Sequence, residues 1–304
     1  MKYNYSVIIP HKESLDTLER LLKSIPNRQD IEIIVVDNSV KGIERADVVS
    51  DKEITILHCN PERFAGGARN VGIDYATGKW LLFADADDYF TDVSFDIFDK
   101  FVNSCYDLIY YHCDSVYDDT LQAAERHIEI NRLLQDYLEL RIPEIKCRLY
   151  MVVPWAKMIL RSLVVENQIR FDEVVAANDI IFSTKVGYLA RKFHVEKSQV
   201  YVVTTRKGSL SNKWNSDILY SRFVTGLKRN LFLREHNLSK YQISVMIYLY
   251  RAIQLSPKNL LTFIVEAIRY RQNIFIGIDN WINTFRKIST TNKKNQKYIV
   301  NDKL

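Results

Sequence analysis

Short apolar runs alternate with polar loops in the first part of the chain. Three of these runs, Tyr5–Ile9, Ile31–Val36 and Ile54–His58, have the length and the β-branched content of buried strands. Between the first two, apolar residues recur on one face of a helix that Ser14 can cap and that Pro26 follows. Because few residues remain for hairpins, the pattern predicts parallel strands joined by right-handed crossovers.

The segment 66–90, GGARNVGIDYATGKWLLFADADDYF, carries the most informative pattern. It predicts a glycine-led helix, a turn and a buried strand, Trp80–Ala84. Asp85, Asp87 and Asp88 follow at the end of that strand, where open α/β sheets bind ligands. Carboxylates in this arrangement favour a divalent cation, Mg²⁺ or Mn²⁺, beside a diphosphate, and the alternative is a solvated acidic turn.

Beyond the strand-like run Leu108–His112, the pattern becomes mainly helical. The sequence predicts a helix over Ala123–Leu140 and another that begins at Asn178 or Asp179 with its apolar side inward. Three more helical stretches follow near the end of the chain: Tyr241–Leu255, Leu260–Tyr270 and Ile274–Ile288.

The composition is that of an ordinary globular chain of 304 residues, 47% hydrophobic and 26% charged. A strand begins almost at once, without a signal peptide, and the four cysteines form no C-x-x-C or metal-ligand pattern. We therefore expect reduced thiols and a cytoplasmic protein. A P-loop is unsupported because Ile73 and Asp74 stand where Lys and Ser or Thr are needed, and no G-x-G-x-x-G for a dinucleotide follows the first strand.

Basic residues are concentrated in the last part of the chain. From residue 221 on, 15 lysines and arginines face four acidic residues, whereas the whole chain has a net charge of +5. These cations are interspersed with apolar helix positions, so we expect no nucleic-acid binding. Glu266, Arg269 and Arg271 interrupt the most apolar stretch, Leu260–Ile278, so we do not expect it to span a bilayer. The helices either lie on an anionic membrane surface or pack on protein.

Four motifs, SVIIPHKES, IIVVDNS, GGARNVGIDYATG and LLFADADD, occur in this order. Together they resemble the nucleotide-sugar half of family 2 glycosyltransferases, which have the GT-A fold. The resemblance implies an α/β fold with a mostly parallel central sheet flanked by helices. It also implies a catalytic domain over residues 1–215, with a nucleotide-sugar half, 1–110, and an acceptor half, 111–215. Residues 216–304 form a basic, aromatic-rich helical C-terminal region.

The resemblance also implies how the donor is bound. Asp37 would accept a hydrogen bond from the base, Arg69 would lie against base or phosphate, and Asp85 would hold the ribose. Taken from the residues alone, Asp37 could instead cap a turn and Arg69 could be an ordinary helix-surface cation. The implied donor-binding residues are Pro10, Glu13, Asp37, Arg69, Asp85 and Arg206, with Ser209 beside the last, and the implied metal ligands are Asp87 and Asp88.

The block VPWAKMILRSLVVENQIRFDE resembles the next motif of the family and implies acceptor binding by Trp155 and Lys157. For Trp155, packing in the core is the alternative. Asp179 matches the second residue of an acidic pair, usually Glu-Asp, in which the Asp is the general base. Asn178 replaces the Glu, which leaves the role of that position open. A plain helix N-cap is the alternative for Asp179, and the reserve candidates for the base are Asp172 and Glu173.

The resemblance implies a transferase that moves a sugar from a nucleotide-sugar donor to a hydroxyl of a glycan or lipid-linked glycan. UDP is the favoured nucleotide, Mn²⁺ or Mg²⁺ the cofactor, and a single displacement with inversion the mechanism, in bacterial surface polysaccharide synthesis. A nucleotidyltransferase and a noncatalytic nucleotide-sugar-binding protein stay open as alternatives. The basic C-terminal helices would allow peripheral contact with the inner membrane surface or a homodimer.

Overall fold

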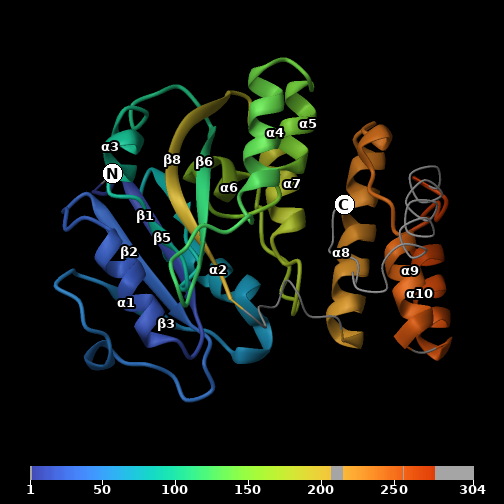
Figure 1. The fold of residues 1–304 in the computed structure, drawn as a ribbon, viewed down its shortest axis with the longest axis horizontal. Coiled ribbons are helices and arrows are strands. Elements are labelled where there is room, and N and C mark those ends of the chain that lie inside the picture. Colours follow the sequence, from blue (N-terminus) through green and yellow to red (C-terminus); the bar gives the residue numbers. More distant parts are fainter. Residues whose placement is uncertain (1, 207–214, 256, 278–304) are drawn as a thin grey trace. The chain divides into compact units, whose positions relative to one another are not determined.

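A computed structural model of the protein describes residues 2–206, 215–255 and 257–277. The chain divides into two compact units, Met1–Trp214 and Asn215–Leu304. The first is an α/β unit and the second is helical (Figure 1).

One sheet of eight strands organises the first unit, in the order β3-β2-β1-β4-β7-β6-β8-β5. The first four of these strands are parallel, β6 and β8 are parallel to each other, and β7 runs antiparallel between β4 and β6. This confirms the expected mostly parallel sheet. The strands are β1 (Tyr5–His11), β2 (Ile31–Asp37), β3 (Thr55–His58), β4 (Trp80–Phe83), β5 (Tyr89–Phe90), β6 (Leu108–Tyr117), β7 (Lys157–Leu160) and β8 (Phe193–Thr205).

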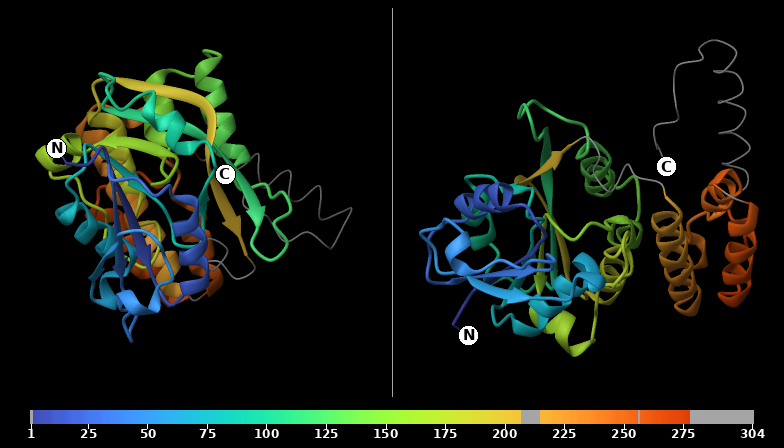
Figure 2. Two further views of the ribbon diagram at one scale, coloured as in Figure 1. Left: turned by 90° about the vertical axis from the view of Figure 1, so that its left-hand side faces the viewer. Right: turned by 90° about the horizontal axis from the view of Figure 1, so that it is seen from below.

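Helices flank this sheet in the views of Figures 1 and 2. Helix α2 packs on β1 and β2, α3 on β8 and α4 on β6. The helical segments of the unit are α1 (Leu15–Ser24), η1 (Arg45–Asp47), η2 (Pro61–Arg63), α2 (Phe64–Tyr75), α3 (Ser94–Asp99), α4 (Ile128–Leu138), α5 (Glu144–Tyr150), α6 (Arg161–Glu166) and α7 (Ile180–Leu189).

A glycine sets how closely α2 approaches the sheet. A Cβ atom at Gly72 would lie 2.4 Å from Cγ2 of Ile8 in β1, so only glycine permits this contact. On the neighbouring helix, Leu18, Leu21 and Leu22 of α1 are buried as the apolar period predicts. Ser14 stands at the N-cap position of α1, but its hydroxyl bonds to that of Thr17 and makes no capping hydrogen bond.

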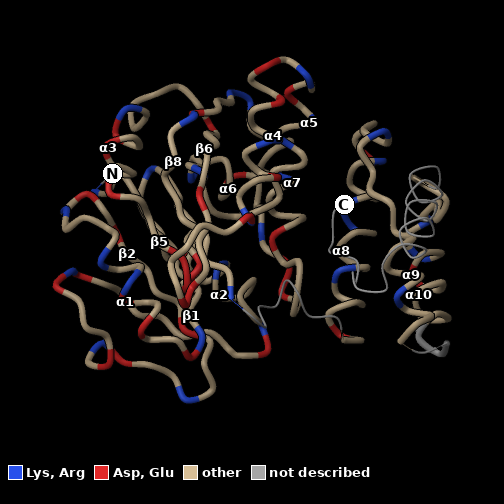
Figure 3. Tube along the Cα trace, viewed as in Figure 1, with Lys and Arg blue, Asp and Glu red and all other residues tan. Residues whose placement is uncertain are grey.

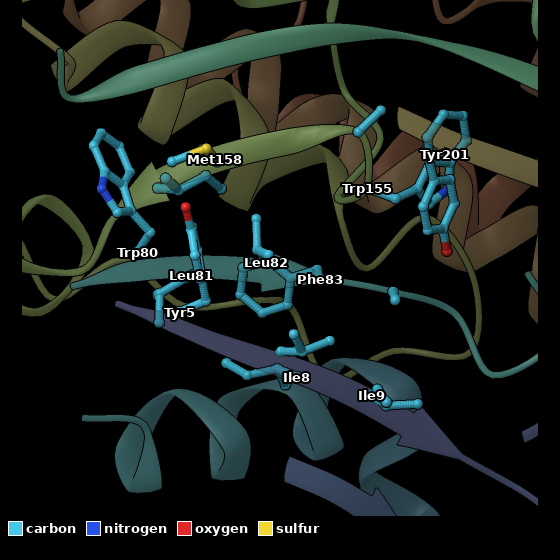
Figure 4. Packing of buried hydrophobic residues seen from close by; sticks show 14 of the residues in the cluster. Tyr5, Ile8, Ile9, Trp80, Leu81, Leu82, Phe83, Trp155, Met158 and Tyr201 are labelled. Carbon is cyan, nitrogen blue, oxygen red and sulfur yellow. The ribbon is translucent and has the colours of Figure 1, made fainter. Parts of the chain in front are cut away.

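Buried aromatic and aliphatic side chains from β1, β4, β7 and β8 form the core of this unit (Figure 4). Trp155 is 2% exposed and stacks on Tyr201, with ring centroids 5.6 Å apart and planes 13° apart. Burial of a large apolar side chain stabilises the fold by about 1.5–3 kcal/mol. The indole therefore belongs to the core, and the expectation that it contacts an acceptor sugar does not agree with this burial.

Helix α4 and strand β7 are among the elements that depart from the sequence prediction. The helix expected over Ala123–Leu140 begins only at Ile128, because Ala123 forms a β-bridge with Val116 in β6. The short strand β7 had no counterpart in the prediction. It is buried on both sides between β4 and β6, so its KMIL sequence lacks the alternation that marks a half-buried strand.

The helical unit is built from α8 (Ser216–Glu235), η4 (Ser239–Tyr241), α9 (Met246–Leu255) and α10 (Pro257–Arg269). The side chain of Asn230, buried in α8, donates to the Ile243 carbonyl at 2.8 Å and accepts from the Ile243 amide at 2.9 Å. Helices α9 and α10 correspond to the predicted stretches 241–255 and 260–270, whereas most of 274–288 lies outside the described residues. Within the described ranges, no helix has both the length and the apolarity that a bilayer crossing needs.

Candidate active site

The carboxyl ends of β1, β2 and β4 bring the sequence motifs together. Because β1 and β2 are parallel and in register, His11 lies directly beside Asp37. Strand β4 is parallel to β1 on its other side and leads into Asp85, Asp87 and Asp88. Figure 3 shows acidic positions gathered at this edge of the sheet, near β1 and β5.

Asp37 is buried, with one carboxylate oxygen fully engaged and the other free. Its Oδ1 lies 2.7 Å from Nδ1 of His11 and accepts from the Ser39 hydroxyl at 2.7 Å and the Ser39 amide at 3.3 Å. The last contact is the turn that the sequence offered as an alternative. Its Oδ2 accepts no hydrogen bond from any residue that the structure describes, and Nδ1 of His58 lies 4.0 Å away. A buried acceptor is thus available at the end of β2.

The loop after β1 lies beside this carboxylate. Pro10 is a buried residue of β1, next to His11. Glu13 has an exposed side chain and a left-handed backbone (φ 54°), and its amide donates to the Ser39 hydroxyl at 2.9 Å. The structure therefore brings Pro10, Glu13 and Asp37 to one strand edge, as expected for one pocket.

Arg69 connects the two halves of the α/β unit. The residue is 5% exposed. Its guanidinium donates to Oδ1 of Asp85 at 2.5 Å and to Oδ1 of Asn178 at 2.8 Å, and lies 5.3 Å from the ring centre of Phe171. Arg69 is therefore not the surface cation that the sequence allowed. Asn178, in place of the usual Glu, keeps a hydrogen bond to this arginine through a neutral amide.

Gly66, at the start of α2, permits the approach of the segment that carries Asn178. A Cβ atom on Gly66 would lie 2.0 Å from the Asp172 carbonyl oxygen and 3.2 Å from Cβ of Asn178. Any larger residue would push this segment away from α2.

Asp87 and Asp88 are adjacent but have different surroundings. Asp88 is 1% exposed, and its Oδ1 accepts the Thr204 amide of β8 at 2.7 Å. Burial, with the charges of Asp85 and Asp87, raises the pKa of Asp88 well above its usual range. The Asp87 carboxylate lies 2.9 Å from Nη2 of Arg206, and burial raises its pKa too. Asp88 thus anchors β8, while Asp87 pairs with the guanidinium of Arg206.

These carboxylates fit a divalent cation only together with a phosphate. No group of three His, Cys, Asp or Glu side chains within the described ranges is placed to hold a metal ion by itself. Mg²⁺ and similar ions commonly bind one or two carboxylates together with substrate phosphates and water. The negative charges of the neighbouring carboxylates contribute to the raised pKa values of Asp87 and Asp88. A bound divalent cation would reduce this repulsion.

Asp179 stands at the N-cap position of α7, but its carboxylate makes no capping hydrogen bond. The plain N-cap alternative therefore does not describe this side chain. Burial raises the pKa of Asp179, while the charge of Arg69 acts in the opposite direction. A half-buried carboxylate with a raised pKa has the properties of a general base.

Lys157 is buried at the start of β7. It is 2% exposed and donates to the Met151 carbonyl at 2.7 Å. Burial lowers its pKa to about 7, and the nearby charge of Asp179 opposes this shift. The expectation that Lys157 contacts an acceptor does not agree with its place in the core. The reserve base Glu173 is bound to Arg63 at 2.6 Å.

A comparison of the sequence with models of protein families matches the region that contains these motifs. The model of glycosyl transferase family 2 matches residues 6–166. The chain belongs to this family. Uncharacterized glycosyltransferase YibD of Escherichia coli K12 is 26% identical to this family 2 glycosyltransferase over 261 residues, which cover 80% of this chain and 73% of YibD.

Solved structures share the GT-A fold of this family 2 glycosyltransferase. Staphylococcus aureus TarS in complex with UDP-GlcNAc superposes with a TM-score of 0.62 at 19% identity, over 88% of this chain and 80% of that one. The mannosyltransferase PcManGT of Pyrobaculum calidifontis, in complex with GDP-Man and Mn²⁺, has a TM-score of 0.53 at 17% identity, over 89% and 83%. In sequence, TarS, a poly(ribitol-phosphate) beta-N-acetylglucosaminyltransferase, is 23% identical over 216 residues. These cover 67% of this chain but only 36% of TarS.

Three residues of the glycosyltransferase site had no role in the sequence prediction. His11 stands in the quoted motif SVIIPHKES, and its place at a strand end was the signal that could have identified it. Arg20 donates to the Asp87 carbonyl oxygen at 2.5 Å, and Arg126 donates to the Thr204 carbonyl oxygen at 3.2 Å. No local pattern distinguishes these two arginines from surface cations. Ser209, expected beside Arg206, lies outside the described residues.

Proposed function

We propose that this family 2 glycosyltransferase transfers a sugar from a UDP-sugar to a hydroxyl group of a glycan or lipid-linked glycan, with inversion. The observation that carries the donor assignment is the buried Oδ2 of Asp37, which accepts no hydrogen bond among the described residues. An unsatisfied buried acceptor costs about 1–3 kcal/mol, so a ligand N–H at this position is strongly favoured.

The base that best suits this acceptor presents an N–H at its pairing edge. Uracil does so at N3, whereas cytosine has a lone pair at the same atom and would repel the carboxylate. Guanine also offers an N–H, but it is a larger purine. The UDP-GlcNAc bound to the similar TarS fold supports uracil, and the GDP-Man bound to PcManGT makes guanine the competitor to test.

The diphosphate would lie between the acidic and basic residues after β4. Asp85 would hold the ribose, and Asp87 would hold Mn²⁺ or Mg²⁺, which supplies neutralisation of the charge on the leaving diphosphate. Arg206 pairs with Asp87 in the described structure and would be free to bind phosphate oxygens when a cation takes its place. Asp88 holds β8 through Thr204 and is proposed to act indirectly.

Asp179 would act as the general base. It would take the proton of the acceptor hydroxyl while that oxygen attacks the anomeric carbon and the bond from that carbon to the diphosphate breaks. One displacement of this kind inverts the configuration, and no carboxylate is assigned as the covalent nucleophile that retention requires. The raised pKa of Asp179 strengthens it as a base near neutral pH.

The noncatalytic alternative rests on Asn178, because the usual Glu is missing there. The hydrogen bond between Asn178 and Arg69 argues against it, since the arginine stays in place without the acidic partner. The nucleotidyltransferase alternative gains no support, because the loop after β1 carries HKES rather than a glycine-rich, basic phosphate loop.

Thermal shift with UDP-, GDP- and CDP-sugars, each with and without Mn²⁺, tests the donor. We expect the largest rise in melting temperature with a UDP-sugar and Mn²⁺, and loss of the Mn²⁺ effect in Asp87→Ala. Release of UDP in the presence of an acceptor would then separate an enzyme from a binding protein. Stabilisation by CDP-sugars equal to that by UDP-sugars would contradict the assignment of Asp37.

A further inference from the structure

We propose that His11 is a positioning residue. It fixes the Asp37 carboxylate so that Oδ2 alone faces the base, and thereby contributes to the preference for uracil over cytosine. The inference rests on the proposed UDP-sugar donor and goes beyond it, because it assigns a cause for the orientation of the base-reading carboxylate. His11 and Asp37 are both buried, and their side chains come from adjacent parallel strands in register.

The hydrogen bonds of the imidazole define which nitrogen carries the proton. Nε2 lies 3.1 Å from the amide of Ser14, which can only donate, so Nε2 must accept. The proton of the neutral ring is therefore on Nδ1, which donates to Oδ1 of Asp37 at 2.7 Å. The backbone at the start of α1 thus sets the tautomer, and the tautomer sets the contact with Asp37.

Three donors converge on the same oxygen of Asp37. Besides Nδ1 of His11, the hydroxyl and the amide of Ser39 donate to Oδ1. None of the described residues donates to Oδ2, although that atom is buried. The carboxylate is therefore held with one oxygen satisfied and the other without a hydrogen bond from any described residue, which is the arrangement a single base N–H can complete.

This arrangement gives His11 a role in discrimination as well as in stability. Hydrogen bonds to a charged group are directional, so their loss lets the carboxylate rotate. A rotated carboxylate would lose the uracil N3–H, but it would not gain a contact at N3 of cytosine, which carries no hydrogen. Removal of the imidazole should therefore weaken UDP binding more than CDP binding.

Isothermal titration of the full chain with UDP and with CDP, at one Mn²⁺ concentration, tests the proposal. In His11→Leu we expect UDP affinity to fall about 10- to 100-fold, as for a lost hydrogen bond to a charged group, while CDP affinity changes less than about 3-fold. His11→Asn can place an amide N–H near the position of Nδ1, so it should restore most of the ratio of UDP affinity to CDP affinity.

The possible results distinguish an error in the proposed donor from an error in the proposed role of His11. If the unmodified protein binds UDP no better than CDP, the proposed donor is wrong. If it prefers UDP and His11→Leu keeps the same ratio, or loses both ligands equally, His11 is structural only and the positioning role is wrong. Should His11→Leu fail to fold, Ser39→Ala removes another donor to Oδ1 and must also lower the ratio.

Discussion

Single residues with the same chemistry have different partners at this site. After β4, Asp85 binds Arg69, Asp87 faces Arg206, and Asp88 accepts the backbone of Thr204. The sequence DADD presents three equivalent acids on a short segment. Their partners lie far away in the chain, so the difference between the three carboxylates follows from tertiary contacts.

Asp179→Asn tests the general base. We expect kcat to fall about 100- to 10,000-fold, as for loss of general-base catalysis, with little change in UDP affinity. The base must be deprotonated, so the rate of the unmodified enzyme should fall as the pH drops through the raised pKa of Asp179. That limb should lie above about 3.9, the ordinary value for aspartate.

UDP release measured from pH 4 to 9 gives both the kcat of Asp179→Asn and the pH dependence of the unmodified enzyme. Glu173→Gln is the matched control, because Glu173 is nearby in sequence but exposed and bound to Arg63. Equal losses in the two variants, or full activity in Asp179→Asn, would remove Asp179 from the mechanism.

At the scale of elements, the sequence predicted the parallel strands β1, β2, β3 and β4 and helices α1 and α2, because apolar runs and periods are local signals. It did not predict β7, which depends on two neighbouring strands for its hydrogen bonds. It also did not predict that α2 is joined to the segment before α7, because that contact depends on Gly66 and on Arg69 at once.

Gly66→Ala tests this junction. Its Cβ would lie 2.0 Å from the Asp172 carbonyl oxygen, so the backbone must move. We expect the free energy of unfolding to fall by about 1–3 kcal/mol. Because the moved segment also carries Asp179, kcat should fall up to about 100-fold, with a smaller change in UDP affinity.

Chemical denaturation and UDP release measure the two effects. Gly226→Ala, in the interior of α8, is the control: its Cβ would meet Ile243 at an ordinary 3.4 Å, and the change should stabilise that helix by about 0.5–1 kcal/mol. An unchanged kcat in a destabilised Gly66→Ala protein would show that the junction does not position Asp179.

At the scale of the whole molecule, the helical unit carries an apolar surface. Helix α10 buries Phe263 and Ala267, yet Leu261, Val265 and Ile268 on another face are 56–70% exposed. Arg269, at the end of this helix, has an exposed side chain. The described part of this unit has nine lysines and arginines against three acidic residues, and Figure 3 shows where they lie along its helices. Such a surface suits an anionic membrane, where a lipid-linked acceptor would be found.

Vesicle sedimentation tests this role. We expect the full chain to bind vesicles that contain an anionic lipid, with weaker binding to neutral vesicles and at high salt. The double variant Leu261→Ser and Ile268→Ser should lower the bound fraction at least about 5-fold, since each buried apolar side chain contributes about 1.5–3 kcal/mol. Leu140→Ser, at an exposed leucine of the other unit, is the control. Loss of a dimer without loss of vesicle binding would instead assign the surface to a second copy of the chain.

The sequence by itself determined the fold class and family, because local features are sufficient to predict both. These features are apolar runs, helix periods and four ordered motifs. It also placed Asp37 and Asp85 at strand ends, since parallel strands end on one edge.

Only the tertiary structure decided what each side chain of the site touches. Trp155 and Lys157, expected at the acceptor, lie in the core, and Arg69 binds Asn178 across 109 positions of sequence. His11 and Ser39 donate to Oδ1 of Asp37, whereas none of the residues that the structure describes donates to its Oδ2. Burial and hydrogen-bond partners arise from segments that meet only when the chain folds, so no local pattern could encode them.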